Sequence, residues 1–386
     1  MYLTSVEEKM LNGEEGEAVS IAMKVLVKVG EALGAEKLIP IAHAHVSGIS
    51  YLNIRDPGLE FIEYLSRTGA KVKVYSTLNP SSFDSELIEL FNLTHEEIEK
   101  QVRIINALIK MGFDPTLTCT PYYLRKPKKG EHLAWGESSA VAYANIVLGA
   151  RTNKEGGPLA LFAALTGRTY YAGLHIEENR IPRIYVKVKT NIDNAVKAGL
   201  LGYYVGEISR GRVAFIEAKF PRSEMMMKSF SAALATSSDN PLAIIDGISP
   251  ETSLLNKDYI EEAISVDDSD LREVMARLSA IRRNKISMFF IGCPHLGLKE
   301  LEYVYDVLSR QGVKEKIILS TSKFIYNVAE KKGLINKLKE LGVIVIKDTC
   351  PIVSRLKIEG AIKTNSVKAA FYIRRLHGLE VLLDDL

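Results

Sequence analysis

The chain has 386 residues, of which 47% are hydrophobic and 25% charged, values typical of a soluble globular protein with two or three domains. Its formal net charge of +3 is too small to indicate binding to nucleic acid or to an anionic membrane surface. The first residues lack a basic start followed by an apolar core, and no apolar run approaches the roughly 20 residues that span a bilayer. We therefore expect a cytoplasmic protein with no membrane and no nucleic-acid partner.

Helix and strand patterns alternate along the first third of the chain. Apolar residues recur at helical spacing in three segments, and apolar or alternating runs between them predict strands. Gly34 marks a helix end, and the pair Thr94 and Glu97 forms a capping box that marks a helix start. The expected elements are a helix over 18–29, a strand over 38–44, a helix over 61–67, a strand over 71–75 and a helix that begins after 94.

The same alternation returns near the C-terminus, after a middle part in which the pattern is less clear. Strands that alternate with helices predict an α/β protein with mostly parallel sheets, whose ligands bind beyond the carboxyl ends of the strands. We expect three α/β regions, at 1–155, 156–281 and 282–386. The remaining elements are strands over 184–188, 213–216, 286–291, 316–319 and 343–346, and helices over 194–201, 299–308 and 325–341.

Three cysteines make up the whole cysteine content, and each stands at the end of an apparent strand, one or two residues before a proline. An odd count argues against a purely disulfide role for Cys119, Cys293 and Cys350. Because parallel strand ends share one edge, the three can converge on one cleft. Three thiolates are too few to saturate a [4Fe–4S] cluster, and the remaining iron would be open to substrate. A three-cysteine zinc site, or buried cysteines that only end strands, are the alternatives.

Polar loops follow several of the predicted strands. They offer backbone N–H groups, hydroxyls and cations that suit a phosphate or a carboxylate, although each alone is more often a turn or a helix cap. His43 and His45 would share one face of a strand, where a core or supporting role is favoured over a metal pair. His295, close to Cys293, is a candidate supporting donor or acid. The loops are 47–50, 76–80, 136–139 and 151–154.

Several stretches taken together resemble the aconitase X family, in particular its archaeal large subunits. The resemblance covers nearly the whole chain, and it implies an aconitase-like core of several doubly wound, mostly parallel-sheet domains around a central cleft. It also implies that the swivelling domain is absent and forms a separate small subunit in a heterodimer or a larger assembly. The stretches are IAHAHVSGISY, STLNPSSFD, TCTPYY, WGESSAVAYANIVLGARTNKEGGPLALFAALTGRTYYAGLH, SSDNP, IGCPHLGL and DTCPIVSRL.

The resemblance further implies an iron–sulfur hydro-lyase that removes water from (R)-5-phosphomevalonate, a small phosphorylated hydroxy acid. The product would be trans-anhydromevalonate 5-phosphate, in the archaeal mevalonate pathway. Cys119, Cys293 and Cys350 would hold a [4Fe–4S] cluster. Members of the superfamily take a serine base from the swivelling domain, so Glu137 and Lys368 are the catalytic candidates of this chain. The substrate contacts would be Ser47, Gly48, Ile49, Ser50, Asn79, Pro80, Glu137, Ser138 and Lys368.

Two other interpretations remain. A related bacterial branch dehydrates cis-3-hydroxy-L-proline, uses a [2Fe–2S] cluster and usually fuses the two subunits. The unfused length, and the scarcity of glutamine beside abundant lysine and glutamate, favour the archaeal branch, since this bias is associated with thermophiles. The alternative from a different class is a non-catalytic α/β binding protein whose cysteines are simply buried.

Overall fold

The computed structural model describes residues 1–281 and 285–386. Within these ranges the strands form three parallel sheets, of three, four and five strands, and one antiparallel pair. The predicted α/β class with mostly parallel sheets is confirmed. The expected boundary between 281 and 282 touches residue 282, which lies outside the described residues. In the described part, no helix combines the length and the apolar character needed to cross a membrane.

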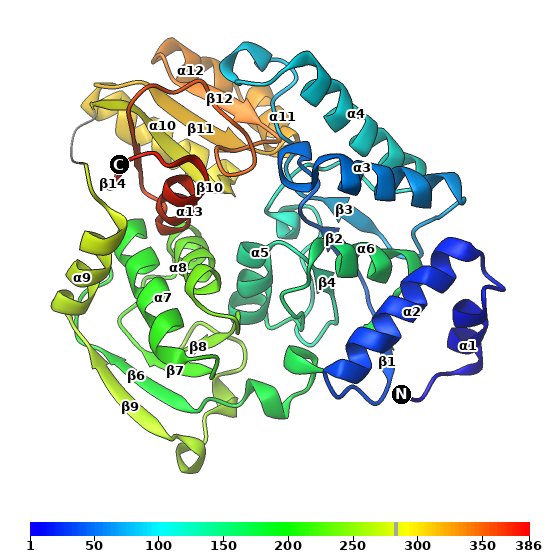
Figure 1. The fold of residues 1–386 in the computed structure, drawn as a ribbon. Coiled ribbons are helices and arrows are strands. Elements are labelled where there is room, and N and C mark those ends of the chain that lie inside the picture. Colours follow the sequence, from blue (N-terminus) through cyan, green and yellow to red (C-terminus); the bar gives the residue numbers. More distant parts are fainter. Residues whose placement is uncertain (282–284) are drawn as a thin grey trace.

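The N-terminal lobe, blue to cyan-green in Figure 1, holds two of the sheets. Its elements are α1 (Ser5–Asn12), α2 (Glu17–Ala32), β1 (Leu38–Pro40), β2 (Ala44–Val46), α3 (Tyr51–Arg67), β3 (Ser76–Leu78), α4 (His95–Lys110), β4 (Ala134–Trp135), α5 (Ser138–Tyr143), α6 (Gly157–Thr166) and β5 (Arg168–Tyr170). The parallel sheet has the order β3-β2-β4, and β1 pairs with β5 in the antiparallel sense. Helix α5 continues directly into a π-helical turn, a feature common at functional sites.

The middle lobe and the C-terminal lobe each contain one parallel sheet. The middle lobe consists of β6 (Ile184–Val188), α7 (Ala195–Ser209), β7 (Ala214–Glu217), α8 (Glu224–Ser237), β8 (Ala243–Ile245), β9 (Glu262–Val266) and α9 (Asp268–Leu278). The C-terminal lobe consists of β10 (Ile286–Leu296), α10 (Leu298–Gln311), β11 (Ile317–Thr321), α11 (Lys323–Lys331), α12 (Leu334–Glu340), β12 (Ile344–Lys347), β13 (Ala361–Thr364), α13 (Val367–His377) and β14 (Val381–Leu383). Their strand orders are β8-β7-β6-β9 and β12-β11-β10-β13-β14.

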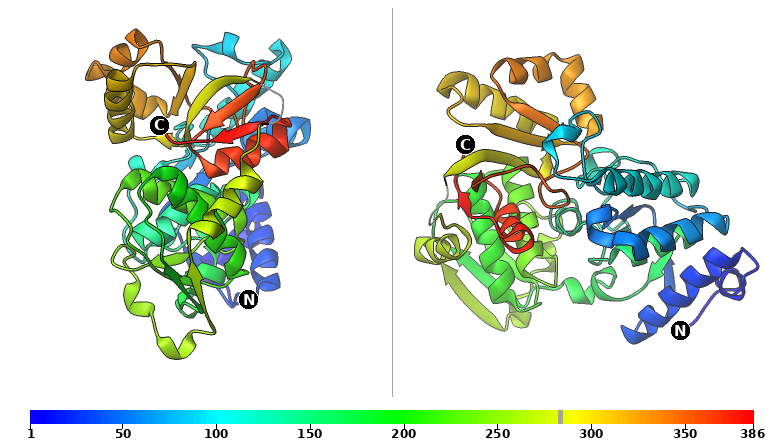
Figure 2. Two further views of the ribbon diagram at one scale, coloured as in Figure 1. Left: turned by 90° about the vertical axis from the view of Figure 1, so that its left-hand side faces the viewer. Right: turned by 45° about the horizontal axis from the view of Figure 1, so that its top comes forward.

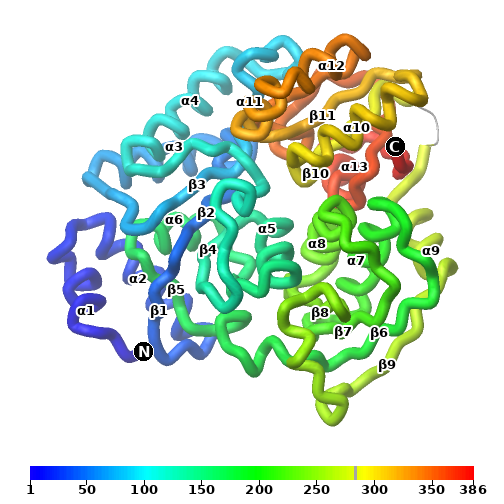
Figure 3. The backbone as a smooth tube through the Cα atoms, turned by 180° about the vertical axis from the view of Figure 1, so that it is seen from behind, coloured from blue at the N-terminus to red at the C-terminus, as the bar shows by residue number. Residues whose placement is uncertain are grey.

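The three lobes surround a centre at which one helix of each lobe is found. Helix α8 of the middle lobe packs against both α5 and α13, and the same arrangement is visible from the front and from behind (Figures 1 and 3). The C-terminal lobe lies above the middle lobe in both views of Figure 2. Loops that leave the inner strand ends of different lobes can therefore meet at this centre.

Two predicted strands of the N-terminal lobe are wrong in position. The run 38–44 is divided between β1 and β2, because Ile41 N donates to Gly167 O and Ala42 N to His132 O where the chain passes from one sheet to the other. The strand predicted over 71–75 lies at β3 instead, within the segment predicted as a loop. Val72 and Lys73 bond to residues at or near the ends of helices α4 and α6, and not to a neighbouring strand.

Two predicted helices also have different bounds. The helix expected over 325–341 is two helices, α11 and α12, separated by Gly333, which has a left-handed φ of +73°. The helix expected over 61–67 is the second half of α3, whose first turn is interrupted at Arg55 (φ +52°), two residues before Pro57. Helix α7 continues eight residues beyond the predicted end at 201, and β10 continues five residues beyond the predicted end at 291. The remaining predicted elements are confirmed within a few residues, among them the capping box at the start of α4.

A row of glycines allows α7 and α8 to pack backbone against backbone. Gly199, Gly202 and Gly206 recur at helical spacing on α7. A Cβ added at Gly202 would collide with the backbone carbonyl of Phe230 on α8. Since the collision is with backbone, no side-chain rotation relieves it, and the two helices would have to separate.

We therefore expect Gly202→Ala to lower the free energy of unfolding by about 1–3 kcal/mol through overpacking, although alanine is the better helix former. The matched control is Gly156→Ala, where φ is −69° and the nearest atom to an added Cβ is 3.9 Å away. Thermal unfolding followed by circular dichroism compares the two variants. Equal midpoints would contradict the close helix contact.

Candidate active site

The loops that follow β2, β3 and β4 lie at one edge of the N-terminal parallel sheet. Strand β2 pairs with both neighbours in parallel, so the three strand ends point the same way. Asn79 N donates to Val46 O at 2.9 Å, and Gly136 N donates to His45 O at 2.8 Å. This edge brings together three of the four predicted loops, 47–50, 79–80 and 136–138.

Two glycines allow loop 47–50 to lie close to its neighbours. A Cβ at Gly136 would lie 2.5 Å from Ser47 Oγ, and a Cβ at Gly157, in the first turn of α6, would lie 2.5 Å from Ser47 O. Gly48 has a φ of +71°, in the left-handed region that favours glycine. The path of this loop therefore depends on the absence of side chains at three positions.

A buried ion pair joins this edge to the C-terminal lobe. Glu137 is the N-cap of α5, and Lys368 lies in the first turn of α13. Lys368 Nζ donates to Glu137 Oε1 and, at 3.1 Å, to Ser138 Oγ. The carboxylate also accepts from Asn79 Nδ2 at 3.0 Å and from Ser139 Oγ at 2.9 Å. Four of the predicted site residues thus lie within one hydrogen-bonded group.

The surroundings of Glu137 hold it in the carboxylate form. Burial would raise the pKa of Glu137, but Lys368 and the hydrogen bonds from Ser139 and Asn79 outweigh burial and lower the pKa to about 2. Burial alone would lower the pKa of Lys368, yet Glu137 raises it above its usual value. Glu137 is therefore a weak proton acceptor in this arrangement, and its negative charge fixes the position of the ammonium group.

A directional hydrogen-bond chain leads from the core to Asn79. Trp135 Nε1 can only donate, and it donates to His43 Nδ1 at 2.8 Å, so His43 carries its proton on Nε2 and donates to the Thr77 hydroxyl at 3.2 Å. That hydroxyl donates to His45 Nδ1 at 2.7 Å. His45 Nε2 then donates to Asn79 Oδ1 at 3.4 Å. The chain orients the Asn79 amide with its NH₂ group toward Glu137.

The tautomers in this chain agree with the electrostatics of the two histidines. Burial lowers the pKa of His43 well below its usual value, and burial lowers the pKa of His45 to about 4 despite the opposing effect of Glu137. Each ring is therefore neutral at neutral pH. The pair has a supporting role in the core, which the sequence favoured over a metal pair.

The three cysteines are free and lie within electrostatic reach of one another. Cys119 and Cys350 are buried and Cys293 is partly buried. Burial is the main reason why the pKa of each thiol is raised to about 12, and each thiol also experiences the charge of another cysteine. The Lys368 ammonium lowers the pKa of Cys119 and Cys293 but does not outweigh burial, so the three side chains are protonated at neutral pH.

Three thiols are the kind of donor set that an iron–sulfur cluster uses. Among residues 1–281 and 285–386, no group of three His, Cys, Asp or Glu side chains is arranged to hold one metal ion. A cluster binds its thiolates on separate iron atoms, which places the sulfurs farther apart than around one ion. The thiols of Cys119, Cys293 and Cys350 come from two lobes and act electrostatically on one another, so their chemistry is compatible with such a group.

His295 connects the three cysteine-bearing turns. Its N–H donates to Cys119 Sγ at 3.1 Å. Its ring donates from Nε2 to Thr349 O at 3.2 Å, next to Cys350, and its Nδ1 accepts from Thr118 Oγ1 at 3.4 Å. With both ring nitrogens engaged and burial lowering its pKa to about 4, the ring is neutral. His295 is thus placed as a supporting donor, one of the two roles considered from the sequence.

The expectation that each cysteine ends a strand is only partly right. Cys119 follows no strand, although Thr118 N bonds to Leu78 O at the end of β3. Cys293 lies within β10, in a stretch where pairing with β11 is interrupted between Ile291 and Leu296. Cys350 comes three residues after β12. An interrupted strand and two loops therefore position the sulfurs, in place of three regular strand ends.

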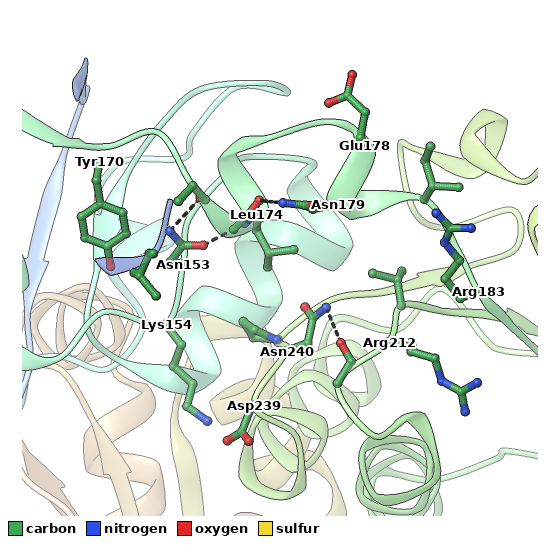
Figure 4. Close-up of a pocket in the computed structure, with 17 residues that line it drawn as sticks. Asn153, Lys154, Tyr170, Leu174, Glu178, Asn179, Arg183, Arg212, Asp239 and Asn240 are labelled. Carbon is green, nitrogen blue, oxygen red and sulfur yellow. Dashed lines mark hydrogen bonds between the residues drawn. The ribbon is translucent and has the colours of Figure 1, made fainter. Parts of the chain in front are cut away.

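The fourth predicted loop, 151–154, faces elsewhere. Lys154 Nζ donates to Ala235 O at 3.2 Å and Ser238 O at 3.1 Å, and so caps the end of α8. Asn153 and Lys154 line a separate cavity of about 690 Å³ between the N-terminal and middle lobes (Figure 4). The loop forms no hydrogen bond with the group around Glu137, because Lys154 binds backbone carbonyls of α8 and Arg151 pairs with Glu177 at 2.6 Å.

Two residues near the cysteines were missed from the sequence. The Ser366 side chain, at the N-cap of α13, hydrogen-bonds the Cys293 thiol. Lys228 reaches His295 O from α8. A single lysine within the apolar stretch MMMKSFSAALA could have indicated a buried, partnered charge, since lysine is almost never fully buried without a partner.

Family models match almost the whole chain. They are described as the aconitase X first domain, which matches residues 1–178, the second domain, which matches 182–276, and the third domain, which matches 286–386. The domain division predicted above is not tested by this comparison and stays a prediction.

Curated relatives and a solved structure agree with these matches. A phosphomevalonate dehydratase large subunit from Aeropyrum pernix is 42% identical, over 99% of this chain and 97% of its own length. One from Thermococcus kodakarensis is 39% identical, over 100% and 98%. A cis-3-hydroxy-L-proline dehydratase from Hypocrea jecorina is 34% identical, over 96% of this chain but 65% of its own length. The crystal structure of Thermococcus kodakaraensis aconitase X in its holo-form superposes with a TM-score of 0.93, at 39% identity over 100% of this chain and 98% of that one. The chain belongs to the aconitase X family.

Proposed function

We propose that this chain is the large subunit of a phosphomevalonate dehydratase, a hydro-lyase that converts (R)-5-phosphomevalonate to trans-anhydromevalonate 5-phosphate in the mevalonate pathway. The observation that carries the proposal is the end-to-end match to large subunits of this name, which covers 97–98% of the two relatives described above. The cis-3-hydroxy-L-proline dehydratases are longer, and the chain spans 65–67% of them. The chain is also more similar to the first group, at 42% and 39% identity against 34% and 32%.

The proposed cofactor is a [4Fe–4S] cluster held by Cys119, Cys293 and Cys350, with [2Fe–2S] as the alternative. When bound, a cluster with three protein ligands supplies a Lewis-acidic iron that favours departure of a hydroxyl group. The free thiols, each of which experiences the charge of another, support this assignment. The family relative whose structure is described as a holo-form supports the presence of a bound group.

The residues of this chain would bind and orient the substrate. Lys368 provides a buried positive charge for a carboxylate or phosphate oxygen, and Glu137 and Ser138 hold its ammonium group in place. Asn79, oriented by the chain from Trp135, presents its NH₂ group on the same side. The remaining proposed contacts come from the loops at the edge of the sheet: Ser47, Gly48, Ile49, Ser50 and Pro80.

The proton acceptor of the reaction is proposed to lie outside this chain. Glu137 is the nearest resident candidate, but its lowered pKa of about 2 makes it a poor base at neutral pH. The large-subunit names of the relatives support a small-subunit partner. We propose that this partner is the swivelling-domain subunit and that it supplies the serine base.

We expect the anaerobically reconstituted chain to bind about four irons and four acid-labile sulfides, because three thiolates can hold one cubane cluster. Cys293→Ser should abolish turnover measured with the small subunit while the fold is kept, since little apolar area is lost. Iron and sulfide analysis beside circular dichroism measures both effects. Full activity of Cys293→Ser would contradict the assignment, and about two irons and two sulfides would favour the [2Fe–2S] alternative.

We expect Lys368→Met to lower kcat/KM for (R)-5-phosphomevalonate by on the order of 10²-fold or more, because a charged donor is removed from the substrate site. The variant also leaves Glu137 buried without its partner, which costs about 3–5 kcal/mol of stability. Product formation with the small subunit present is followed by mass spectrometry.

A second variant separates activity from stability in this experiment. Lys368→Met combined with Glu137→Gln removes both charges, so stability should recover while activity stays low. Lys363→Met is the matched control, since this partly exposed lysine of the same lobe pairs with Glu315 and Asp384 at the surface. A double variant with wild-type kcat/KM would show that the pair is only structural.

The competing substrate is tested with the same enzyme. A wild-type complex that dehydrates cis-3-hydroxy-L-proline and leaves phosphomevalonate unchanged would overturn the proposed function in favour of the longer relatives' activity. Product formation that requires the phosphorylated substrate is the expected result.

A further inference from the structure

Lys228 lies at the point where the three lobes meet, next to the cysteine-bearing turns. Its side chain is 2% exposed and comes from α8 of the middle lobe. Its Nζ contacts Glu300 and His295 of the C-terminal lobe and Tyr123 of the N-terminal lobe. One ammonium group therefore binds atoms from two other lobes at once.

Two of the contacts of Lys228 act on the backbone between Cys293 and α10. Nζ donates to His295 O at 2.7 Å and to the Glu300 carboxylate, whose Oε2 also accepts from Gly297 N at 2.7 Å. Residues 295–300 are thus held at three points: the carbonyl of His295, the N–H of Gly297 and the side chain of Glu300 in the first turn of α10.

The Tyr123 ring closes the other side of this cluster. The Tyr123 hydroxyl lies 3.2 Å from Lys228 Nζ, and the ammonium lies 5.2 Å from the ring centroid. A Cβ at Gly297 would collide with the same ring, so glycine is required for the turn to pass it. Tyr123 follows Cys119 by four residues. The group therefore fixes turns of two lobes relative to each other.

The backbone that Lys228 holds is the one that donates to a cysteine. His295 accepts from Lys228 through its carbonyl and donates through its N–H to Cys119 Sγ at 3.1 Å. Hydrogen bonds to cluster sulfurs help to set the stability and the potential of iron–sulfur centres. A small cavity of about 30 Å³ is lined by both Lys228 and Cys293. A displacement of Lys228 would thus affect the turns that carry Cys119 and Cys293.

Taking the three cysteines as cluster ligands, as the proposed function does, we propose that Lys228 is a positioning residue for the cluster. It holds the His295 backbone so that the N–H of His295 stays directed at Cys119 Sγ. It also keeps the cysteine-bearing turns of the N-terminal and C-terminal lobes in a fixed position relative to each other. Its role is exerted through other residues, and it contacts neither the cysteines nor the proposed substrate loops.

The test uses a variant that is neutral at this position. Lys228→Met alone would leave the Glu300 charge buried without a partner, so we combine it with Glu300→Gln, whose amide oxygen can still accept from Gly297 N. After anaerobic reconstitution, the release of iron to a ferrous chelator is followed together with the loss of the visible absorption of the cluster. We expect release about tenfold faster than in the wild type, the lower end of the usual effect of removing a supporting partner of a metal ligand.

A second buried ion pair serves as the matched control. Arg180 and Glu251 are 0% and 7% exposed, and the bonds of Arg180 reach none of the cysteine turns. Arg180→Met with Glu251→Gln should destabilise the fold without a comparable effect on iron release at a temperature where both variants are folded.

The outcomes separate this inference from the proposed function. A wild-type chain that binds no iron would overturn the proposed function itself. A wild-type chain that holds a cluster, with equal release rates in the Lys228 double variant, would overturn only the role of Lys228. Equal acceleration in the two double variants would also overturn it, because the effect would then be general destabilisation. Faster release in the Lys228 double variant alone is the expected result.

Discussion

The buried ion pair between Glu137 and Lys368 is the interaction on which the arrangement of the candidate site depends. Glu137 caps the N-terminus of α5, where the helix dipole favours a negative charge. Lys368 occupies the first turn of α13, where the dipole disfavours a positive charge, so its ammonium is stable there only because Glu137 and Ser138 are in contact. A buried cation without a partner would be too costly to keep. The pair therefore fixes the N-terminal and C-terminal lobes relative to each other at the place where the substrate loops and the cysteines meet.

The Glu137 carboxylate also explains the role of the buried hydrogen-bond chain that leads from Trp135 to Asn79. A carboxylate that must accept several donors needs those donors to point toward it, and the amide of Asn79 could in principle turn either way. Trp135 cannot accept a hydrogen bond, so its position at one end gives the whole row a single direction through His43, Thr77 and His45. Neutral histidines suit this task because each ring both accepts and donates. Core residues with no contact to substrate thus determine which group of Asn79 faces the site.

How far the sequence predicts this structure can be stated element by element. Long amphipathic helices such as α2 and α4 and the buried strands of the C-terminal lobe were predicted, because periodicity reports which face is buried. The short strands around 38–44 and 71–78 were misplaced, because three-residue strands are defined by partners far away in the chain and not by their own pattern. The meeting of loops 47–50, 79–80 and 136–138 was not predicted, although the rule that parallel strand ends share one edge of a sheet explains it. The contact between Glu137 and Lys368 spans 231 residues and was not predicted, and Lys368 itself was named only through the family resemblance. Lys228 was missed because its partners come from two other lobes.

The environment of the three thiols would couple the proposed cluster to the folded core. A thiol with a pKa of about 12 does not ionise by itself at neutral pH, so the energy for forming thiolates would have to come from the iron of the proposed cluster. Because the sulfurs come from two lobes, binding one group also holds these lobes together. The lobes must already be close for the group to bind, and the contacts of His295, Glu137 and Lys368 bring them close without it. Polar bonds between the lobes therefore preorganise the place where the three cysteines lie, and the proposed cluster would add its own binding energy to them.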